Sequence, residues 1–233
     1  MRTAIITGAS VGIGHAAAAL FIEADYQVYN LSRRNCDVQG VQNIKCDLSR
    51  ESDIQRALEI LLPAAARAES VCLVHNACQM RKDSVDDCSS DNLAAVLQTN
   101  VIAANSLNQE LLPQMRAGSS VLYIGSTLAE KAVAGSFSYV LSKHAVVGMM
   151  RATCQDLIGR GIHTACICPG FTNTEMLRTH LGNDQVVIDS IASLNSFNRL
   201  IEPKEIADLI FWSHHNPVIN GSVLHAHLGQ KES

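Results

Sequence analysis

The stretch TAIITGASVGIG, residues 3–14, decides the fold of this 233-residue chain. Its first five residues form a short apolar run of the kind found in buried strands, and an alanine-rich helical pattern follows from residue 12. Gly8, Gly12 and Gly14 let the backbone turn tightly, approach a pyrophosphate and pack helix on strand, while the helix N-terminus offers unpaired N–H groups. The stretch predicts a dinucleotide-binding turn; a purely structural glycine-rich turn is the alternative.

Short apolar runs and helical patterns alternate from this turn to the end of the chain. Strands that are apolar at every position are typical of a parallel sheet covered on both faces. We therefore predict an α/β fold, a Rossmann-type doubly wound parallel sheet of about seven strands flanked by helices on both faces, in one domain spanning 1–233. Strands are expected near 3–7, 27–31, 41–46, 71–75, 120–125, 162–168 and 222–226, and helices near 12–24, 51–68, 90–112, 139–159 and 203–213.

The segment 171–200 interrupts this alternation with an amphipathic stretch that follows Pro169 and Gly170. In a sheet of this kind it lies at the carboxyl edge, where ligands bind, so we expect it to be a lid over the substrate. The aliphatic residues of the lid favour a substrate with an apolar part.

Composition excludes several classes of function. The chain has 18 Lys and Arg against 22 Asp and Glu, which predicts no nucleic-acid partner. It has no room for a signal peptide before the first strand and no apolar run of about 20 residues, so we expect a cytoplasmic protein without a membrane partner. Eight cysteines and nine histidines show no metal-ligand spacing, and no metal is expected.

Tyr139 and Lys143 are four residues apart in a predicted helix and therefore share one face. A phenol titrates near ~10 when unperturbed, and a neighbouring ammonium lowers that pKa. Such a pair suits carbonyl reduction or alcohol oxidation, although the same spacing also arises by chance on exposed helices.

Together with this pair, six further motifs stand along the chain in the order that is found in one protein family. Thr-Gly-x-x-x-Gly-x-Gly at 7–14 resembles the cofactor turn of the short-chain dehydrogenase/reductase family, in its single-domain branch. The other matches are Asp47 after the third strand, the run His75-Asn76-Ala77-Cys78 in place of Asn-Asn-Ala-Gly, Asn100 in a helix, Ser126 thirteen residues before Tyr139, and the Pro-Gly segment at 169–174. Within that branch the chain resembles 3-oxoacyl carrier-protein reductase-like members, and a reductase of small ketones and aldehydes is also open.

The resemblance implies a role for each matching residue. Tyr139 donates or accepts the proton, Lys143 lowers the Tyr139 pKa and binds the nicotinamide ribose, Ser126 holds the substrate oxygen, and Asn100 positions a water beside Lys143. The implied cofactor-binding residues are Gly8, Ser10, Val11, Gly12, Ile13, Gly14, Ser32, Arg33, Asp47, Leu48, Asn76, Ala77, Tyr139, Lys143, Pro169, Gly170, Phe171, Thr172 and Thr174.

The residues after the second strand bear on the choice of cofactor. An acidic side chain there would bind the adenosine ribose of NAD(H), whereas an arginine would pair with the 2′-phosphate of NADP(H). Ser32 stands in the place of the acid and Arg33 follows it, which favours NADP(H) and leaves NAD(H) open; Arg34 is expected in a solvated loop.

We therefore predict an NADP-dependent oxidoreductase that moves hydride between nicotinamide and a carbonyl or secondary alcohol. A catalytically silent NADP(H)-binding sensor or scaffold is the alternative. The helix near 139–159 is apolar on more faces than one sheet needs, which predicts a homodimer or homotetramer. His75, Cys78 and the missing C-terminal Asp-Gly-Gly depart from the family pattern, and the substrate and the direction of reaction stay open.

Overall fold

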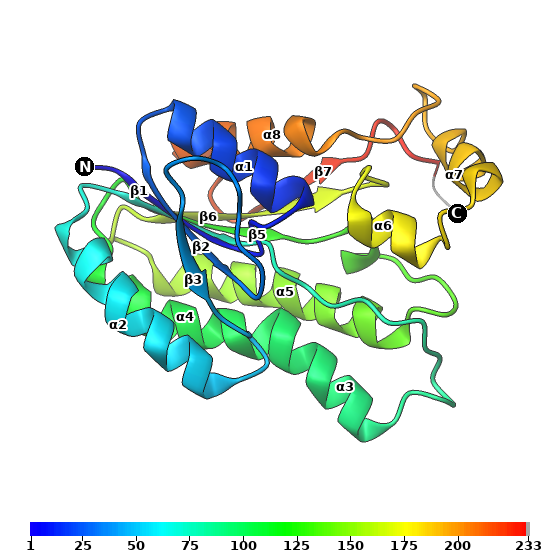
Figure 1. Ribbon diagram of the computed structural model, residues 1–233, viewed down its shortest axis with the longest axis horizontal. Coiled ribbons are helices and arrows are strands. Elements are labelled where there is room, and N and C mark those ends of the chain that lie inside the picture. The colour runs from blue at the N-terminus through cyan, green and yellow to red at the C-terminus, as the bar shows by residue number, and fades with distance from the viewer. Residues whose placement is uncertain (232–233) are drawn as a thin grey trace.

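The computed structural model describes residues 1–231, and its centre is a parallel sheet of seven strands in the order β3-β2-β1-β4-β5-β6-β7 (Figure 1). Every neighbouring pair of strands runs parallel, which confirms the predicted fold class. The strands are β1 (Thr3–Thr7), β2 (Gln27–Ser32), β3 (Gln42–Lys45), β4 (Val71–His75), β5 (Ser120–Ile124), β6 (His163–Pro169) and β7 (Ser222–Ala226).

Helices cover both faces of this sheet. One face is covered by α1 (Gly12–Glu23) and α8 (Pro203–His215), and the other by α2 (Glu51–Arg67), α4 (Ala103–Leu111) and α5 (Phe137–Asp156) (Figure 1). Ile5 and Leu73 face the α2, α4 and α5 layer, whereas Ile6 and Val74 face the α1 and α8 layer. Both sides of each central strand are thus buried, which explains why apolar residues occupy consecutive positions in these strands.

The order of the strands places a crevice at the carboxyl end of β1. The chain moves from β1 to β2 and β3 on one side and then returns to β4 on the other. In open parallel sheets, ligands bind at such a switch point. The glycine turn begins directly after β1, so the fold brings it to this edge.

The expected helix near 90–112 is divided in two. It consists of α3 (Ser90–Leu97), a π-helical turn at Gln98–Ile102 and then α4. A π turn inserts one extra residue into the helix, and such insertions are frequent at functional sites. A 3.6-residue pattern does not reveal the insertion, because the apolar face continues on either side of it.

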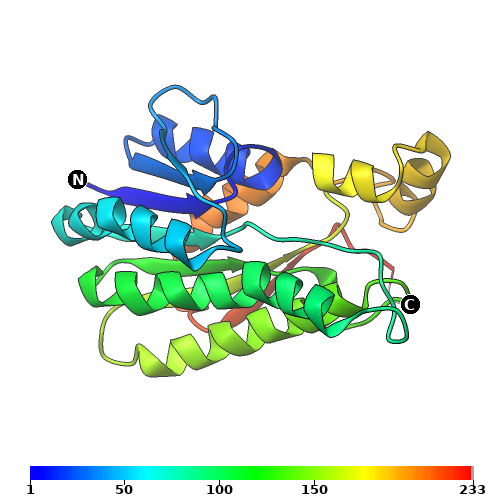
Figure 2. The ribbon, with the colours of Figure 1, turned by 60° about the horizontal axis from the view of Figure 1, so that its bottom comes forward.

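The segment 171–200 contains two short helices, α6 (Glu175–His180) and α7 (Gln185–Ala192), which project beyond the carboxyl edge of the sheet (Figure 2). Thr174 caps α6 by accepting from the N–H of Leu177, and Asp184 caps α7 by accepting from the N–H of Val186. Across residues 1–231, we find no helix with the length and apolar character needed to cross a membrane.

Candidate active site

The glycine turn packs directly against the end of β4. A Cβ at Gly14 would lie 2.5 Å from the carbonyl oxygen of Gly8, and one at Gly8 would lie 3.0 Å from Cα of Ala77. The side-chain amide of Asn76 donates to the carbonyl oxygens of Thr7 and Gly8, at 3.0 Å each. Glycine is therefore required where the backbones meet, and the end of β4 holds the turn in shape.

Two residues that support the turn are not among the catalytic and cofactor-binding residues predicted from the sequence. The hydroxyl of Thr7 accepts from the N–H groups of Asn76 and Ala77, at 3.0 Å each. The side-chain oxygen of Asn30 accepts from the N–H of Ala9 at 2.9 Å. A buried asparagine in the middle of the apolar strand β2 is a signal that could have identified Asn30, because buried amides need partners.

Ser32, Arg33 and Arg34 extend from β2 at the same edge. The Ser32 hydroxyl donates to the carbonyl oxygen of Arg34 at 2.5 Å. Hydrogen bonding from Ser49, with a smaller effect from the charge of Arg33, lowers the pKa of Asp47, which follows β3. Ser32 pairs with Lys45 in the sheet, so Arg33 and Asp47 both follow the carboxyl ends of two neighbouring strands.

Arg34 is not simply solvated. Its guanidinium contacts both carboxylate oxygens of Glu175 in α6, at 3.1 and 3.3 Å. This exposed pair connects the loop after β2 to the segment 171–200. Beside it, a Cβ at Gly12 would lie 3.1 Å from the methyl group of Thr174, so the start of α6 lies over the glycine turn.

Ser126, Tyr139 and Lys143 come together beyond the end of β5. Ser126 caps a short turn by accepting from the N–H of Leu128 at 3.1 Å. Tyr139 is 8 % exposed and Lys143 is 2 % exposed, and the Lys143 nitrogen lies 5.4 Å from the centre of the Tyr139 ring. Lys143 Nζ donates to the carbonyl oxygen of Ile124 at 2.7 Å, which fixes the ammonium beneath the phenol.

The surroundings of Tyr139 act on its pKa in opposite directions. Burial raises the pKa of the phenol, whereas the charge of Lys143 and then the hydroxyl of Ser126 lower it, and burial outweighs them. The phenol therefore carries its proton near neutral pH. In that state it can donate a proton to a bound oxygen atom.

Asn100 lies buried in the π turn, and both the oxygen and the nitrogen of its side-chain amide are hydrogen-bonded. Its oxygen accepts from the N–H of Gln79 at 2.7 Å, and its nitrogen donates to the Gln79 carbonyl and the Ser142 hydroxyl, at 2.9 Å each. Asn100 does not bond Lys143 directly, but both line a cavity with about 10 Å³ of space for the centre of a water molecule. That is close to the space one water needs.

His75 braces the core below this site. Its Nε2 donates to the side-chain oxygen of Asn108 at 2.8 Å, and the Asn108 amide donates to the Tyr123 hydroxyl at 2.7 Å. Burial lowers the pKa of His75 to about 4, so the ring is neutral at physiological pH. The histidine thereby joins β4 to α4 and β5.

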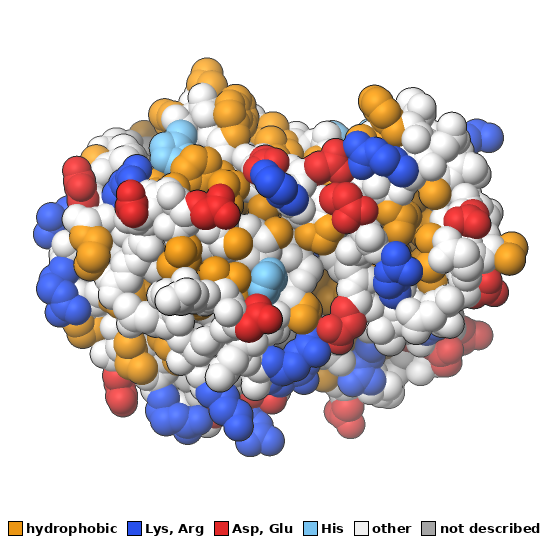
Figure 3. Space-filling view, turned by 45° about the horizontal axis from the view of Figure 1, so that its top comes forward, with side chains coloured by type: hydrophobic (Ala, Val, Ile, Leu, Met, Phe, Trp, Pro, Cys, Tyr) orange, Lys and Arg blue, Asp and Glu red, His pale blue; other side chains and the backbone are white. Residues whose placement is uncertain are grey.

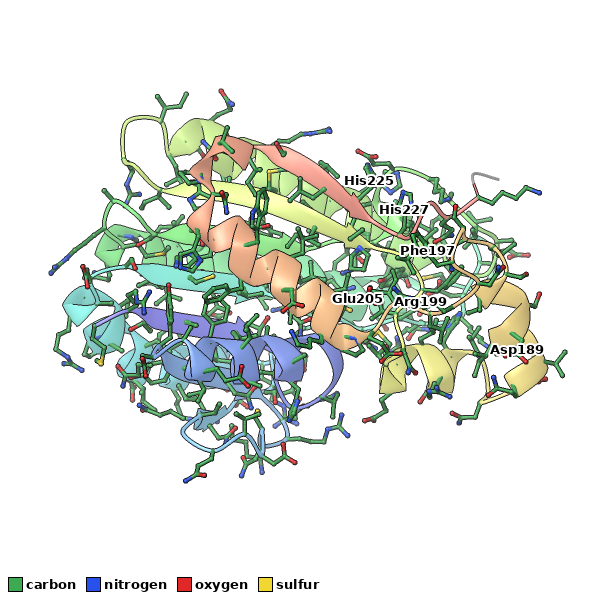
Figure 4. The ribbon with its side chains drawn as sticks, turned by 90° about the horizontal axis from the view of Figure 1, so that it is seen from above. Asp189, Phe197, Arg199, Glu205, His225 and His227 are labelled. Carbon is green, nitrogen blue, oxygen red and sulfur yellow. The ribbon has the colours of Figure 1, made fainter. Side chains whose placement is uncertain are left out.

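The Pro-Gly segment packs against the chain after β7. The N–H of Gly170 donates to the carbonyl oxygen of Ala226 at 2.9 Å, and the Thr172 hydroxyl donates to the Gly170 carbonyl at 3.1 Å. Figure 4 shows His225 and His227 at the end of β7, beside the segment that carries Phe197 and Arg199. The expected cofactor residues Pro169, Gly170, Phe171, Thr172 and Thr174 lie between the end of β6 and the start of α6, and Thr174 reaches back to Gly12 of the glycine turn.

Comparisons with known proteins identify the family to which this fold belongs. A family model described as enoyl-(acyl carrier protein) reductase matches residues 8–231. A short-chain dehydrogenase family protein from Francisella tularensis is 25 % identical, covers 97 % of each chain and superposes with a TM-score of 0.89. The chain belongs to the short-chain dehydrogenase/reductase family.

Two further relatives resemble this chain along most of their length. Protein FixR from Bradyrhizobium diazoefficiens is 30 % identical over 91 % of this chain and 79 % of its own. The rhamnolipids biosynthesis 3-oxoacyl-[acyl-carrier-protein] reductase of Pseudomonas aeruginosa is 29 % identical, over 89 % of this chain and 87 % of its own. This short-chain dehydrogenase/reductase is accordingly an NAD(P)-dependent oxidoreductase.

Proposed function

We propose that this short-chain dehydrogenase/reductase is an NADP(H)-dependent reductase of ketones or aldehydes, with Tyr139 as the proton donor. The observation that carries the proposal is the buried pair of Tyr139 and Lys143 beside Ser126, at the edge of the sheet where the glycine turn lies. A protein that only bound a dinucleotide would have no use for a phenol held over an ammonium.

Each residue of the site has a distinct task in this reaction. Bound NADPH supplies the hydride that reaches the carbonyl carbon. Tyr139 gives its proton to the carbonyl oxygen, and Ser126 holds that oxygen by a hydrogen bond. Lys143 stabilises the phenolate that forms, because its ammonium is fixed by the Ile124 carbonyl. A water in the cavity between Asn100 and Lys143 would return the proton from solvent.

The glycine turn is a suitable site for the pyrophosphate of the cofactor. A side chain at Gly14 would collide with the backbone, and the N-terminus of α1 opens directly beside the turn. Arg33, exposed and close to Asp47, is the residue we assign to the 2′-phosphate. A short-chain dehydrogenase from Burkholderia cenocepacia, 25 % identical with a TM-score of 0.87, was solved in complex with NADP, which supports NADP(H) as the cofactor.

The segment 171–200 supports a substrate with an apolar part. Val186 is 79 % exposed and Met176 and Leu194 are 40 % exposed, so these side chains are free to contact a ligand. We assign the segment the role of a lid. The carbonyl reductase family member 4 of Xenopus tropicalis, 25 % identical over 96 % of this chain and 95 % of its own, agrees with a carbonyl substrate.

The test is NADPH oxidation, followed by absorbance, with ketones, aldehydes and acetoacetyl thioesters of increasing chain length as substrates. We expect turnover with NADPH that improves as the apolar part of the substrate grows. Tight NADPH binding without turnover across this panel would contradict the proposal and favour a silent sensor.

A further inference from the structure

Three side chains with metal-binding atoms meet outside the active site. A ring nitrogen of His15, Sγ of Cys36 and a carboxylate oxygen of Asp37 all lie within 4.8 Å of one another. His15 belongs to the first turns of α1, and the other two lie in the loop between β2 and β3. The sequence does not reveal this group, because His15 and Cys36 are 21 residues apart.

The three side chains differ in burial: one is enclosed in the core and two are open to solvent. The thiol side is enclosed, because Cys36 is 3 % exposed and packs in the core beneath α1. His15 and Asp37 face outward with side-chain exposures of 37 % and 91 %, and they bond each other at 2.7 Å. An ion reaching this point from solvent would meet two exposed ligands first and then the thiol.

The backbone of Cys36 is fixed before any ion arrives. The side-chain oxygen of Asn43 accepts from the Cys36 N–H at 2.8 Å, and the Asn43 amide donates to the Cys36 carbonyl oxygen at 2.9 Å. The buried side chain of Asn30 donates to Asn43 at 2.8 Å. A ligand held on such a network loses little conformational freedom when it binds a metal.

We propose that His15, Cys36 and Asp37 bind one zinc ion. Sulfur, imidazole nitrogen and carboxylate oxygen together form a donor set that zinc accepts, with a water as the fourth ligand. Ligands around tetrahedral zinc are about 3.5 Å apart, so the His15–Asp37 pair must open by about 1 Å. Cys36 binds as the thiolate and releases its proton to solvent.

The ion would stabilise the loop that carries Arg33. Asn30 joins Asn43 to the N–H of Ala9 in the glycine turn, so one buried network connects the zinc ligands with the cofactor turn. Occupancy by zinc is therefore expected to tighten NADPH binding as well. This consequence rests on the proposed function, whereas the zinc site does not.

The first experiment measures metal binding by the purified, metal-free full chain, with no cofactor present. Titration with Co²⁺ should produce a thiolate charge-transfer absorption at one ion per chain, and Zn²⁺ should remove it by displacement. Cys36→Ser should abolish the absorption. Cys88→Ser, which alters a half-buried thiol elsewhere, is the matched control and should preserve it.

The second experiment measures Zn²⁺ affinity by competition with a chromophoric chelator. His15→Gln and Asp37→Asn change exposed side chains and should not disturb folding, which the melting temperature without metal verifies. Each should weaken Zn²⁺ binding by at least about tenfold. Zn²⁺ should also raise the melting temperature of the natural chain more than that of either variant.

Unchanged Zn²⁺ affinity in these variants, or no stoichiometric binding by the natural chain, would overturn the proposal and leave an ordinary His–Asp pair beside a thiol. If NADPH binding fails while zinc binding follows this pattern, the error lies in the proposed function and not in the site.

Discussion

Arg33 and Arg34 are adjacent in sequence but have different surroundings. Arg34 holds Glu175 of α6, whereas Arg33 is exposed near Asp47. The sequence showed that an arginine follows β2, but it could not show which of the two is engaged elsewhere. The engaged arginine is decided by the position of Glu175 in the fold, and Glu175 lies 141 residues after Arg34 in the sequence.

Arg33→Ala should lower NADPH affinity by about tenfold or more and leave NADH affinity nearly unchanged, because only NADP(H) carries the 2′-phosphate. The measurement is the Kd of each cofactor by calorimetry. Arg34→Ala is the comparison and should affect both cofactors alike. Equal losses for NADH and NADPH in Arg33→Ala would refute the assignment of Arg33.

His75 and His214 should make stability depend on pH. Burial lowers the pKa of His75 to about 4 and that of His214 to about 3, from an ordinary value of 6.5. Below about pH 6.5, both histidines are therefore protonated in the unfolded chain but stay neutral in the folded chain. Stability is full above pH 6.5 and falls toward pH 4, by about 1.4 kcal/mol per pH unit for each histidine.

Urea unfolding at several pH values between about 4.5 and 7 measures this slope. His75→Asn, which restores the residue usual in the family, should reduce the slope by about 1.4 kcal/mol per pH unit. His214→Gln should do the same independently. A slope that neither change alters would mean that other groups control the acid sensitivity.

At the scale of elements, the junction between β5 and the turn after it determines where Ser126 lies. The N–H of Gly125 donates to the carbonyl oxygen of Ile167 in β6 at 2.7 Å. A Cβ at Gly125 would lie 2.7 Å from Sγ of Cys168 and 2.8 Å from Sγ of Cys166. The thiols of Cys166 and Cys168 thus set how closely β6 approaches the site.

Gly125→Ala should destabilise the fold by about 1–3 kcal/mol, because the buried thiols have no room to move away. It should also lower kcat by displacing Ser126. In a background where Cys166 and Cys168 are both alanine, the same change should cost measurably less. A double-mutant cycle measures this, by urea unfolding of the natural chain, Gly125→Ala, the chain with both cysteines replaced, and the chain with all three changes. An equal cost in both backgrounds would show that the thiols are not the cause.

The helices were predictable to different degrees. The bounds of α1, α2 and α8 follow from apolar periodicity and lie within a few residues of the predictions. The π turn at Asn100 was not predictable, because it depends on the contact of Asn100 with Gln79 and Ser142 across the fold. Motif order singled out Asn100 in the chain, whereas only the structure shows the cavity that it shares with Lys143.

At the scale of the whole molecule, the strand alternation sufficed to predict the sheet, since parallel crossovers allow few topologies. The surface in Figure 3 carries basic and acidic side chains intermixed, without one continuous charged field on that face. The pattern of residues 139–159 predicts a surplus apolar face on α5, and the structure identifies the residues that lie on its outer side. There Leu141 is 42 % exposed, and Gly148 has no atom within 4 Å of the position of its missing side chain.

We propose that this outer face of α5 packs against a second copy of the chain, as in a homodimer or homotetramer. Gly148→Arg should then yield monomers, because a long charged side chain cannot be accommodated in a close helix contact. Light scattering coupled to size-exclusion chromatography measures the mass. Ile60→Arg on α2, also an exposed site, should leave the assembly unchanged. A natural chain that is already monomeric would contradict the proposal.

The central claim is that Tyr139 supplies the proton during carbonyl reduction. The most direct measurement is kcat for NADPH-dependent reduction by Tyr139→Phe, together with the Kd of NADPH. Tyr26→Phe is the control, since the Tyr26 hydroxyl bonds His215 on the α1 and α8 side of the sheet. We predict that kcat falls by about 10²–10⁴-fold in Tyr139→Phe while NADPH affinity is retained. Turnover near that of the natural protein would contradict the account.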